Sequence, residues 1–130
     1  MILRGDSVLL VERGREPLRG HWSLPGGVLE VGGLLEDAIR REVREETGLD
    51  VEPLAVVEVF QWIIPGQENK PEYHYVIIDY LCAVQGGELR AASDVSRAAW
   101  VRRDEFSRYL ITEGATSVIE KGFRKRDELK

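Results

Sequence analysis

The feature that most constrains the fold is one strong helix prediction set among strand-forming runs. Leu34 to Thr47 has a helical period of apolar residues, and Gly48 follows where a left-handed helix cap is expected. Strands in succession, interrupted by one strong helix and closed by another, predict an α+β fold with a mixed β-sheet between helices. No repeat, low-complexity tract or linker divides the 130 residues. We therefore expect one domain over residues 1–130.

The other elements are predicted from branched and aromatic residues and from the turn residues between them. Strands are predicted for four runs: 7–12, 55–64, 72–84 and 98–102. Shorter helices are predicted for 103–109 and 113–122, the second followed by a charged tail. The chain begins almost inside its first predicted strand, as if residues before Met1 were missing or the start were unusually short.

Composition narrows the class of partner. The net charge is −5, with 23 acidic and 18 basic side chains, so no general attraction to nucleic acid polymers or anionic membranes is expected. No run approaches the roughly 20 apolar residues of a membrane helix, and the start does not resemble a signal peptide. Cys82 is the single cysteine, which fits a reducing compartment. We expect a cytoplasmic protein.

Three glutamates on the predicted helix form the candidate chemical site: Glu42, Glu45 and Glu46. At about 100° per residue they continue an apolar stripe rather than the solvent face. The stripe consists of Leu35, Ala38, Ile39 and Val43. The side expected to face solvent consists of Asp37, Arg40 and Arg44. Buried, clustered carboxylates are costly without a counter-charge, and hard cations such as Mg²⁺ prefer carboxylate oxygens. A solvated acidic face with Arg–Glu pairs is the alternative that the spacing alone leaves open.

The segment around this helix resembles a known family. Residues 27–49, GVLEVGGLLEDAIRREVREETGL, are similar to the signature of the Nudix hydrolases: Gly, five residues, Glu, seven residues, then Arg-Glu-aliphatic-any-Glu-Glu-any-Gly-aliphatic. The resemblance implies a Nudix-type α/β/α sandwich with Mg²⁺, or Mn²⁺ in its place, bound by the three glutamates. It also implies that Arg41 orients Glu42 and that the carbonyl of Gly26 supplies another metal oxygen.

One signature position departs from the pattern. The leading Glu of the family falls at position 33, where this sequence has Gly33. In relatives that side chain braces the loop against the arginine that matches Arg41, so the resemblance implies a looser loop and a slower enzyme. Glu30 or Glu36 could partly replace the brace.

The resemblance implies hydrolysis of a pyrophosphate linkage in a small nucleotide. The favoured substrate is a nucleoside diphosphate linked to another group, such as ADP-ribose. The alternatives are a nucleoside triphosphate cleaved to the monophosphate, or a nucleotide-sensing module without turnover. Glu45 is the predicted water-activating residue, and acidic residues of distant loops are weaker candidates: Glu113, Asp94 and Glu68. A homodimer is possible.

Aromatic residues on or beside the long predicted strands are candidates for stacking on a nucleobase: Phe60, Trp62, Tyr73 and Tyr75. For each one, packing in the core or on the sheet surface is the more common role. Trp22, just before the Pro-Gly-Gly break, is interpreted either as a wall of the substrate site or as the edge of the core.

Overall fold

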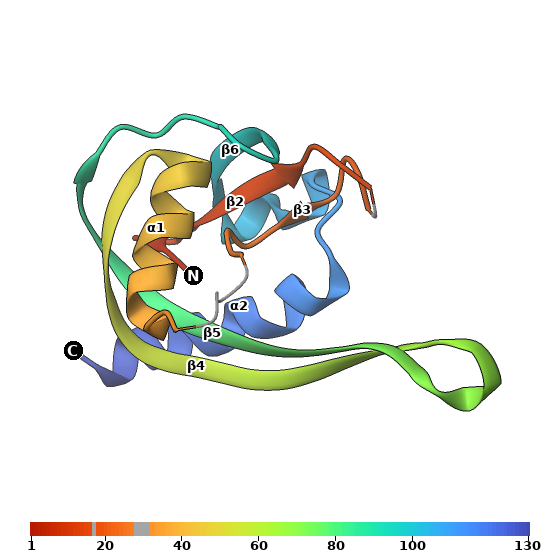
Figure 1. Cartoon of the computed structure of the whole chain (residues 1–130). Helices are drawn as coiled ribbons and strands as arrows, with labels where there is room; N and C mark the ends of the chain where they lie inside the picture. Colours follow the sequence, from red (N-terminus) through yellow and green to blue (C-terminus); the bar gives the residue numbers. More distant parts are fainter. Residues whose placement is uncertain (17, 28–31) are drawn as a thin grey trace.

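The computed structural model describes residues 1–16, 18–27 and 32–130, with the side chains at 64, 69 and 71 also outside the description. Strand β2 (Ser7–Arg13) is the central strand of the first of two sheets (Figure 1). Strand β6 (Val95–Arg102) pairs with β2 along its whole length. The short strands β1 (Leu3–Arg4) and β3 (Trp22–Ser23) pair with the two ends of β2.

The second sheet is one long hairpin. Strands β4 (Leu49–Pro65) and β5 (Pro71–Gly87) pair antiparallel and are joined by a 3₁₀ turn at Gln67–Asn69. Every pairing between named strands is antiparallel. Among the described residues, parallel pairing occurs at two isolated bridges, Ile2 to Cys82 and Trp22 to Ile111. The outer part of the hairpin, residues 61–76, projects from the body in Figure 1, and we call it the arm.

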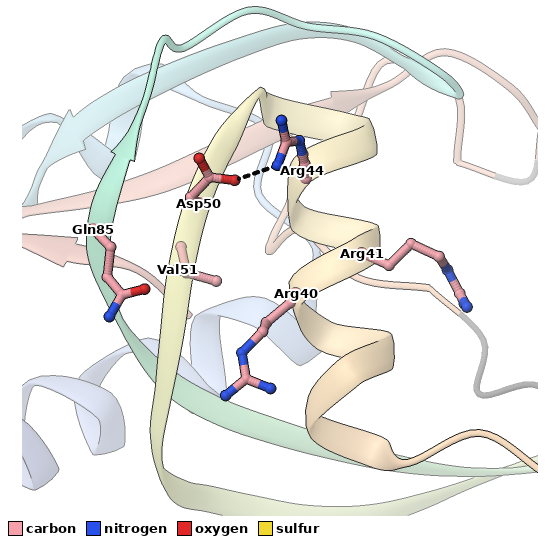
Figure 2. Close-up of a pocket in the computed structure, with 6 residues that line it drawn as sticks. All are labelled: Arg40, Arg41, Arg44, Asp50, Val51 and Gln85. Atoms are coloured by element: carbon pink, nitrogen blue, oxygen red, sulfur yellow. Dashed lines mark hydrogen bonds and ion pairs between the residues drawn. The ribbon is translucent and has the colours of Figure 1, made fainter.

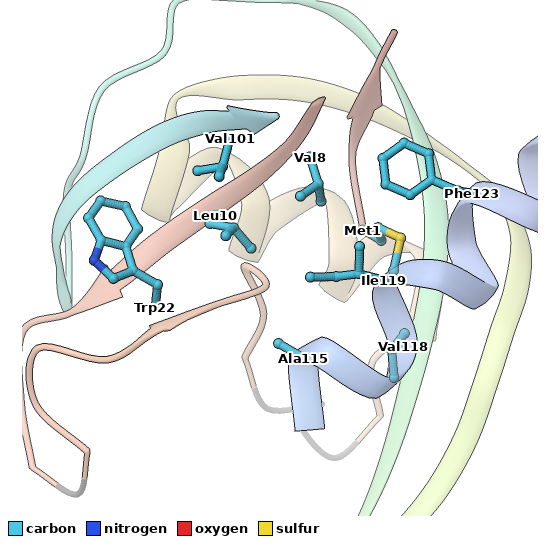
Figure 3. Packing of buried hydrophobic residues seen from close by; sticks show 9 residues of the cluster. All are labelled: Met1, Val8, Leu10, Trp22, Val101, Ala115, Val118, Ile119 and Phe123. Carbon is cyan, nitrogen blue, oxygen red and sulfur yellow. The ribbon is translucent and has the colours of Figure 1, made fainter. Parts of the chain in front are cut away.

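Helices cover both faces of the central sheet. In β2, Val8 and Leu10 point into a cluster with α2 (Glu113–Glu128), whereas Leu9 points into a second cluster with Val43. Val43 lies on α1 (Leu35–Thr47). Figure 3 shows the α2 side of this packing. A strand buried on both faces reads as a continuous apolar run, as SVLLVE does. The predicted α/β/α arrangement is confirmed.

Helix α1 ends where the sequence predicts. Gly48 is left-handed, with φ of 75°, and its N–H donates to the carbonyl of Arg44 at 2.9 Å. A Cβ at this position would lie 2.3 Å from the carbonyl oxygen of Glu88, so close approach of the backbone also requires glycine. Leu49 follows the cap and is buried.

Four element boundaries differ from the prediction by three residues or more, one of them the end of strand β5 at Gly87 rather than at 84. Strand β4 starts six residues before the predicted 55, because a register shift after Pro53 lets the strand accommodate a residue with no N–H to donate. Strand β6 starts at Val95 rather than 98. Helix α2 continues to Glu128 rather than 122, because buried Phe123 extends its apolar side into the charged tail. The guanidinium groups of Arg103 and Arg126 lie over the Phe123 ring at 4.3 and 5.1 Å.

A carboxylate on β2 makes part of the stability depend on pH. Glu12 accepts hydrogen bonds from Arg97 and from Ser96, whose Oγ lies 2.6 Å away, and these bonds lower its pKa to about 2. A lowered pKa in the folded state stabilises the fold above the unfolded value of about 4.5. That contribution is lost as the pH falls through about 2. We expect the difference in thermal stability between the wild type and Glu12→Gln to shrink from pH 5 to pH 2. Calorimetry at both pH values measures it, and a constant difference would contradict the pairing.

Candidate active site

Helix α1 presents its three glutamates at different depths. Glu42 and Glu46 are half-buried, whereas Glu45 is exposed. The predicted continuation of the buried face therefore applies to two of the three carboxylates.

The predicted solvent side of α1 is confirmed for two of its three members. Asp37 and Arg44 are exposed. Arg40 is half-buried, contrary to the prediction, because its guanidinium reaches across to Glu52 on β4 at 3.1 Å.

The Pro-Gly-Gly turn after β3 packs directly on these carboxylates. The N–H of Gly26 donates to Oε2 of Glu46 at 3.4 Å. A Cβ built on Gly27 would lie 2.2 Å from both Cδ and Oε2 of Glu42. Position 27 must therefore be glycine for the Glu42 carboxylate to stay where it is. The backbone of this turn and the carboxyl groups of α1 form one continuous surface.

Arg41 links two of the glutamates. Its Nη2 donates to Oε1 of Glu42 at 3.2 Å, and its Nε lies 3.9 Å from Oε1 of Glu45. The first contact is the one expected of a residue that orients Glu42. The second turns Glu45 toward the arginine.

Burial and neighbouring charge make Glu46 an unfavourable place for a negative charge. Burial, together with the negative charges of Glu42 and Asp94, raises its pKa to about 7. The Gly26 hydrogen bond and the charge of Arg13 oppose this rise. A bound cation would relieve this repulsion.

The side chains of Glu42, Glu45 and Glu46 offer carboxylate oxygens, which are the ligands that a hard divalent cation prefers. Two of these three residues are half-buried. Within the described ranges no three His, Cys, Asp or Glu side chains stand together as a ready-made ligand group. Glu45 would have to turn from Arg41 to join Glu42 and Glu46.

Glu36 was suggested as a partial replacement for the family glutamate that is absent at Gly33. Glu36 pairs with Arg40, at 4.0 Å, and not with Arg41. Glu30, the other suggested replacement, lies outside the described residues.

The loop that carries Asp94, one of the predicted candidates, reaches the end of α1. Its backbone N–H groups at Arg90 and Ala92 donate to the carbonyls of Thr47 and Glu46 at 2.9 and 3.1 Å. These contacts bring Asp94 close enough to influence Glu46. The nearest sequence signal is Gly14, where a Cβ would lie 2.9 Å from the Asp94 carbonyl oxygen. The docking of this loop on α1 and the effect of Arg13 on Glu46 were not predicted.

The other two distant acidic candidates lie elsewhere. Glu68 is in the turn at the tip of the arm, and Glu113 is in the first turn of α2. Of the three loop candidates for activating water, the structure connects Asp94 alone electrostatically with Glu46.

The candidate aromatic residues separate into two groups. Trp22 is buried in the core with its ring edge-on to Tyr109 at 5.1 Å, which favours the packing interpretation over a substrate wall. Phe60 is half-buried against the same core.

The remaining aromatic candidates lie on the arm. Trp62, Tyr73 and Tyr75 are exposed there and contact one another, with ring centroids 5.8 and 6.0 Å apart. They form a small aromatic ladder on the surface rather than a wall around the carboxylates.

A cavity of about 600 Å³ opens beside α1 (Figure 2). It is lined by Arg40, Arg41, Arg44, Asp50, Val51 and Gln85. None of the three glutamates and neither turn glycine lines it. Arg44 is already paired with Asp50 at 3.0 Å, and Figure 2 shows Arg41 directed to the other side of the helix. The cavity is therefore separate from the candidate site.

Comparisons with known proteins agree with this geometry. The sequence model of the NUDIX domain matches residues 1–121. An ADP-ribose pyrophosphatase from Methanocaldococcus jannaschii is 34% identical over 98 residues, which are 75% of this chain and 56% of that protein. A MutT-like protein from Streptomyces ambofaciens is 34% identical over 120 residues, which are 92% of this chain and 71% of that protein. The chain thus spans little more than half of the first relative.

A solved structure of a member of the same family has a similar fold. A NUDIX hydrolase from Nitrosomonas europaea superposes with a TM-score of 0.78 and 26% identity, over 95% of this chain and 84% of that one. In the described part of the chain, no helix is long and apolar enough to cross a membrane.

Proposed function

The chain belongs to the NUDIX domain family, and from this premise we propose that it is a divalent-cation-dependent hydrolase that cleaves a pyrophosphate linkage in a nucleotide. One observation supports the proposal most strongly. The Gly26-Gly27 turn is packed onto Glu42 and Glu46, with the Gly26 N–H bonded to Glu46 and no room for a side chain at Gly27. A solvated acidic face would need neither contact.

We assign the metal to Glu42, Glu45, Glu46 and the carbonyl of Gly26. Mg²⁺ bound there, or Mn²⁺ in its place, would neutralise the pyrophosphate charge. Arg41 orients Glu42 through its hydrogen bond at 3.2 Å.

The water that attacks phosphorus needs a base that solvent can reach. Glu45 meets this requirement on α1 because it is exposed. Asp94 is the second candidate, because it lies near Glu46 and is also exposed. Attack breaks the P–O–P bond, and two phosphate monoesters leave.

Among substrates we favour a nucleoside diphosphate linked to another group, of which ADP-ribose is the example. The similarity to a relative named as an ADP-ribose pyrophosphatase supports this choice. Hydrolysis of a nucleoside triphosphate to the monophosphate is the alternative. Gly33 in place of the family glutamate leads us to expect slow turnover rather than none.

The deciding experiment is a substrate panel. ADP-ribose, NADH, nucleoside triphosphates and dinucleoside polyphosphates are incubated with Mg²⁺, with Mn²⁺ and with EDTA, and the products are separated by ion-exchange chromatography. We expect ADP-ribose to give AMP and ribose 5-phosphate only when the metal is present. Pyrophosphate release from a triphosphate would select the alternative substrate class. Nucleotide bound in EDTA with no product under any condition would overturn the enzyme and leave a sensing module.

A further inference from the structure

The two ends of helix α1 are held in place by different contacts. At the C-terminal end, Gly48 caps the helix and the loop of residues 88–94 donates hydrogen bonds to the last carbonyls. At the N-terminal end the cap position is Leu34, whose apolar side chain cannot accept a hydrogen bond from the first turn. Within residues 35–47, all of which the structure describes, no residue before Ala38 is buried. The first turn therefore depends on contacts made further along the helix.

Arg40 makes such a contact. Its Nη1 donates to Oδ1 of Asp37 in the first turn, and its Nη2 donates to Oε1 of Glu52 on β4, both at 3.1 Å. One guanidinium thus connects the first turn of α1 to the second sheet. The side chains of Arg40 and Glu52 are 38% and 42% exposed, and salt screens a partly buried pair less than a fully exposed one. Glu36, at 4.0 Å from the same guanidinium, adds only a weak attraction.

We propose that Arg40 is a positioning residue of the candidate active site, which acts through Glu52 to hold the N-terminal half of α1 so that Glu42 stays in its place beside Gly27. The proposal rests on the proposed function, because it takes Glu42 as a metal ligand. The fit leaves little freedom, since a Cβ on Gly27 would lie 2.2 Å from the carboxyl group of Glu42. Displacing an active-site group by about 1 Å is costly. A small movement of this half of the helix is therefore sufficient to disturb the site.

Arg40 acts through the helix and not by touching the cation. Glu42 lies two positions further along, and at about 100° per residue two positions place side chains on nearly opposite sides of a helix. Figure 2 shows the same separation, because Arg40 is directed to the β4 side and Arg41 to the other side. Arg41 is the residue that bonds to Glu42, at 3.2 Å. The effect of Arg40 on the glutamates is therefore carried by the backbone of α1.

Arg44 provides a matched comparison on the same side of α1. Its Nη1 donates to Oδ1 of Asp50 on β4 at 3.0 Å, one turn further along the helix than the pair made by Arg40. This end of α1 is already fixed by Gly48 and by the loop of residues 88–94. If ion pairs with β4 only added general stability, removing either arginine would have the same effect. The proposed role predicts an effect for Arg40 alone.

The first test needs neither metal nor turnover. Amide hydrogen exchange of residues 38, 39, 42 and 43 is recorded in EDTA for the wild type, Arg40→Gln, Glu52→Gln and the control Arg44→Gln. An exposed ion pair contributes up to about 1 kcal/mol, which is about 5-fold in an equilibrium constant. We therefore expect exchange about 3- to 5-fold faster in the first two variants and no change in the control. Thermal unfolding checks that each variant is folded. Unchanged exchange in Arg40→Gln, or an equal change in Arg44→Gln, would overturn the proposal.

The second test uses Mn²⁺ alone, whose binding is measured by electron paramagnetic resonance of the free ion. We expect Arg40→Gln and Glu52→Gln each to weaken binding about 3- to 5-fold, and the double variant to bind no more weakly than either, because both changes remove the same bond. Arg44→Gln should bind like the wild type. A wild type that binds no Mn²⁺ would overturn the metal site of the proposed function. Binding by the wild type with equal binding by every variant, or losses that add in the double variant, would overturn only the role of Arg40.

Discussion

Glu46→Gln is expected to lower kcat by on the order of 10³-fold while leaving the protein folded. Glutamine has the same shape, and its amide oxygen can still accept the Gly26 N–H bond. It removes the charge that we assign to the cation. The charge is costly in the cation-free protein, because Glu46 is half-buried beside Glu42. We therefore expect no loss of thermal stability without metal.

The measurement is product formation under saturating Mg²⁺, together with a thermal unfolding curve in EDTA. Glu36→Gln is the matched control, since Glu36 lies on the same helix but pairs with Arg40 away from the turn. The control should retain wild-type kcat. If Glu46→Gln kept more than a tenth of the activity, the assignment of Glu46 to the metal would be wrong.

Gly27→Ala is expected to reduce activity by about 10²-fold with little change in stability. A Cβ at position 27 would overlap Cδ and Oε2 of Glu42. These atoms are the far end of a flexible side chain, so the fold can adjust by turning the carboxylate aside. Displacing a catalytic group by about 1 Å costs roughly this factor.

The separation of activity from stability is what makes Gly27→Ala informative. The kinetic constants and the unfolding temperature are both measured, beside Gly114→Ala, where a Cβ would meet nothing within 4 Å. The control should leave the kinetic constants unchanged and should not lower the unfolding temperature, because alanine favours a helix over glycine. A large drop in unfolding temperature for Gly27→Ala would indicate that the turn, and not the carboxylate, gives way. Unchanged activity would show that the position of Glu42 is unimportant.

The parts of the site that lie close together in sequence were predictable. The helical spacing placed Glu42 and Glu46 beside the buried face of α1, though not Glu45, which is exposed. The glycine after Thr47 gave the end of the helix correctly. Both signals act over a few residues, where backbone geometry alone determines which side chains are neighbours. The same reasoning predicted the alternation of strands and helices, and hence the α+β fold.

The parts that depend on distant contacts were not predictable. Arg40 was expected in solvent, because periodicity does not show that Glu52 lies opposite it. Asp94 was one of three equal candidates until backbone contacts placed its loop against α1. The start of β4 was missed because Pro53 reads as a strand breaker, and only the pairing with β5 reveals the register shift that accommodates it.

The loop of residues 88–94 packs against the C-terminal end of α1 and supplies hydrogen bonds to its last turn. The last carbonyls of a helix ordinarily face water or a cap residue. Here the carbonyls of Glu46 and Thr47 receive N–H groups from this loop, at positions some 45 residues further along the chain. Surface loops usually tolerate changes of length, because they fix nothing but their own ends. An insertion in this one would withdraw two hydrogen bonds from the turn that bears Glu46, so its length is a property of the site.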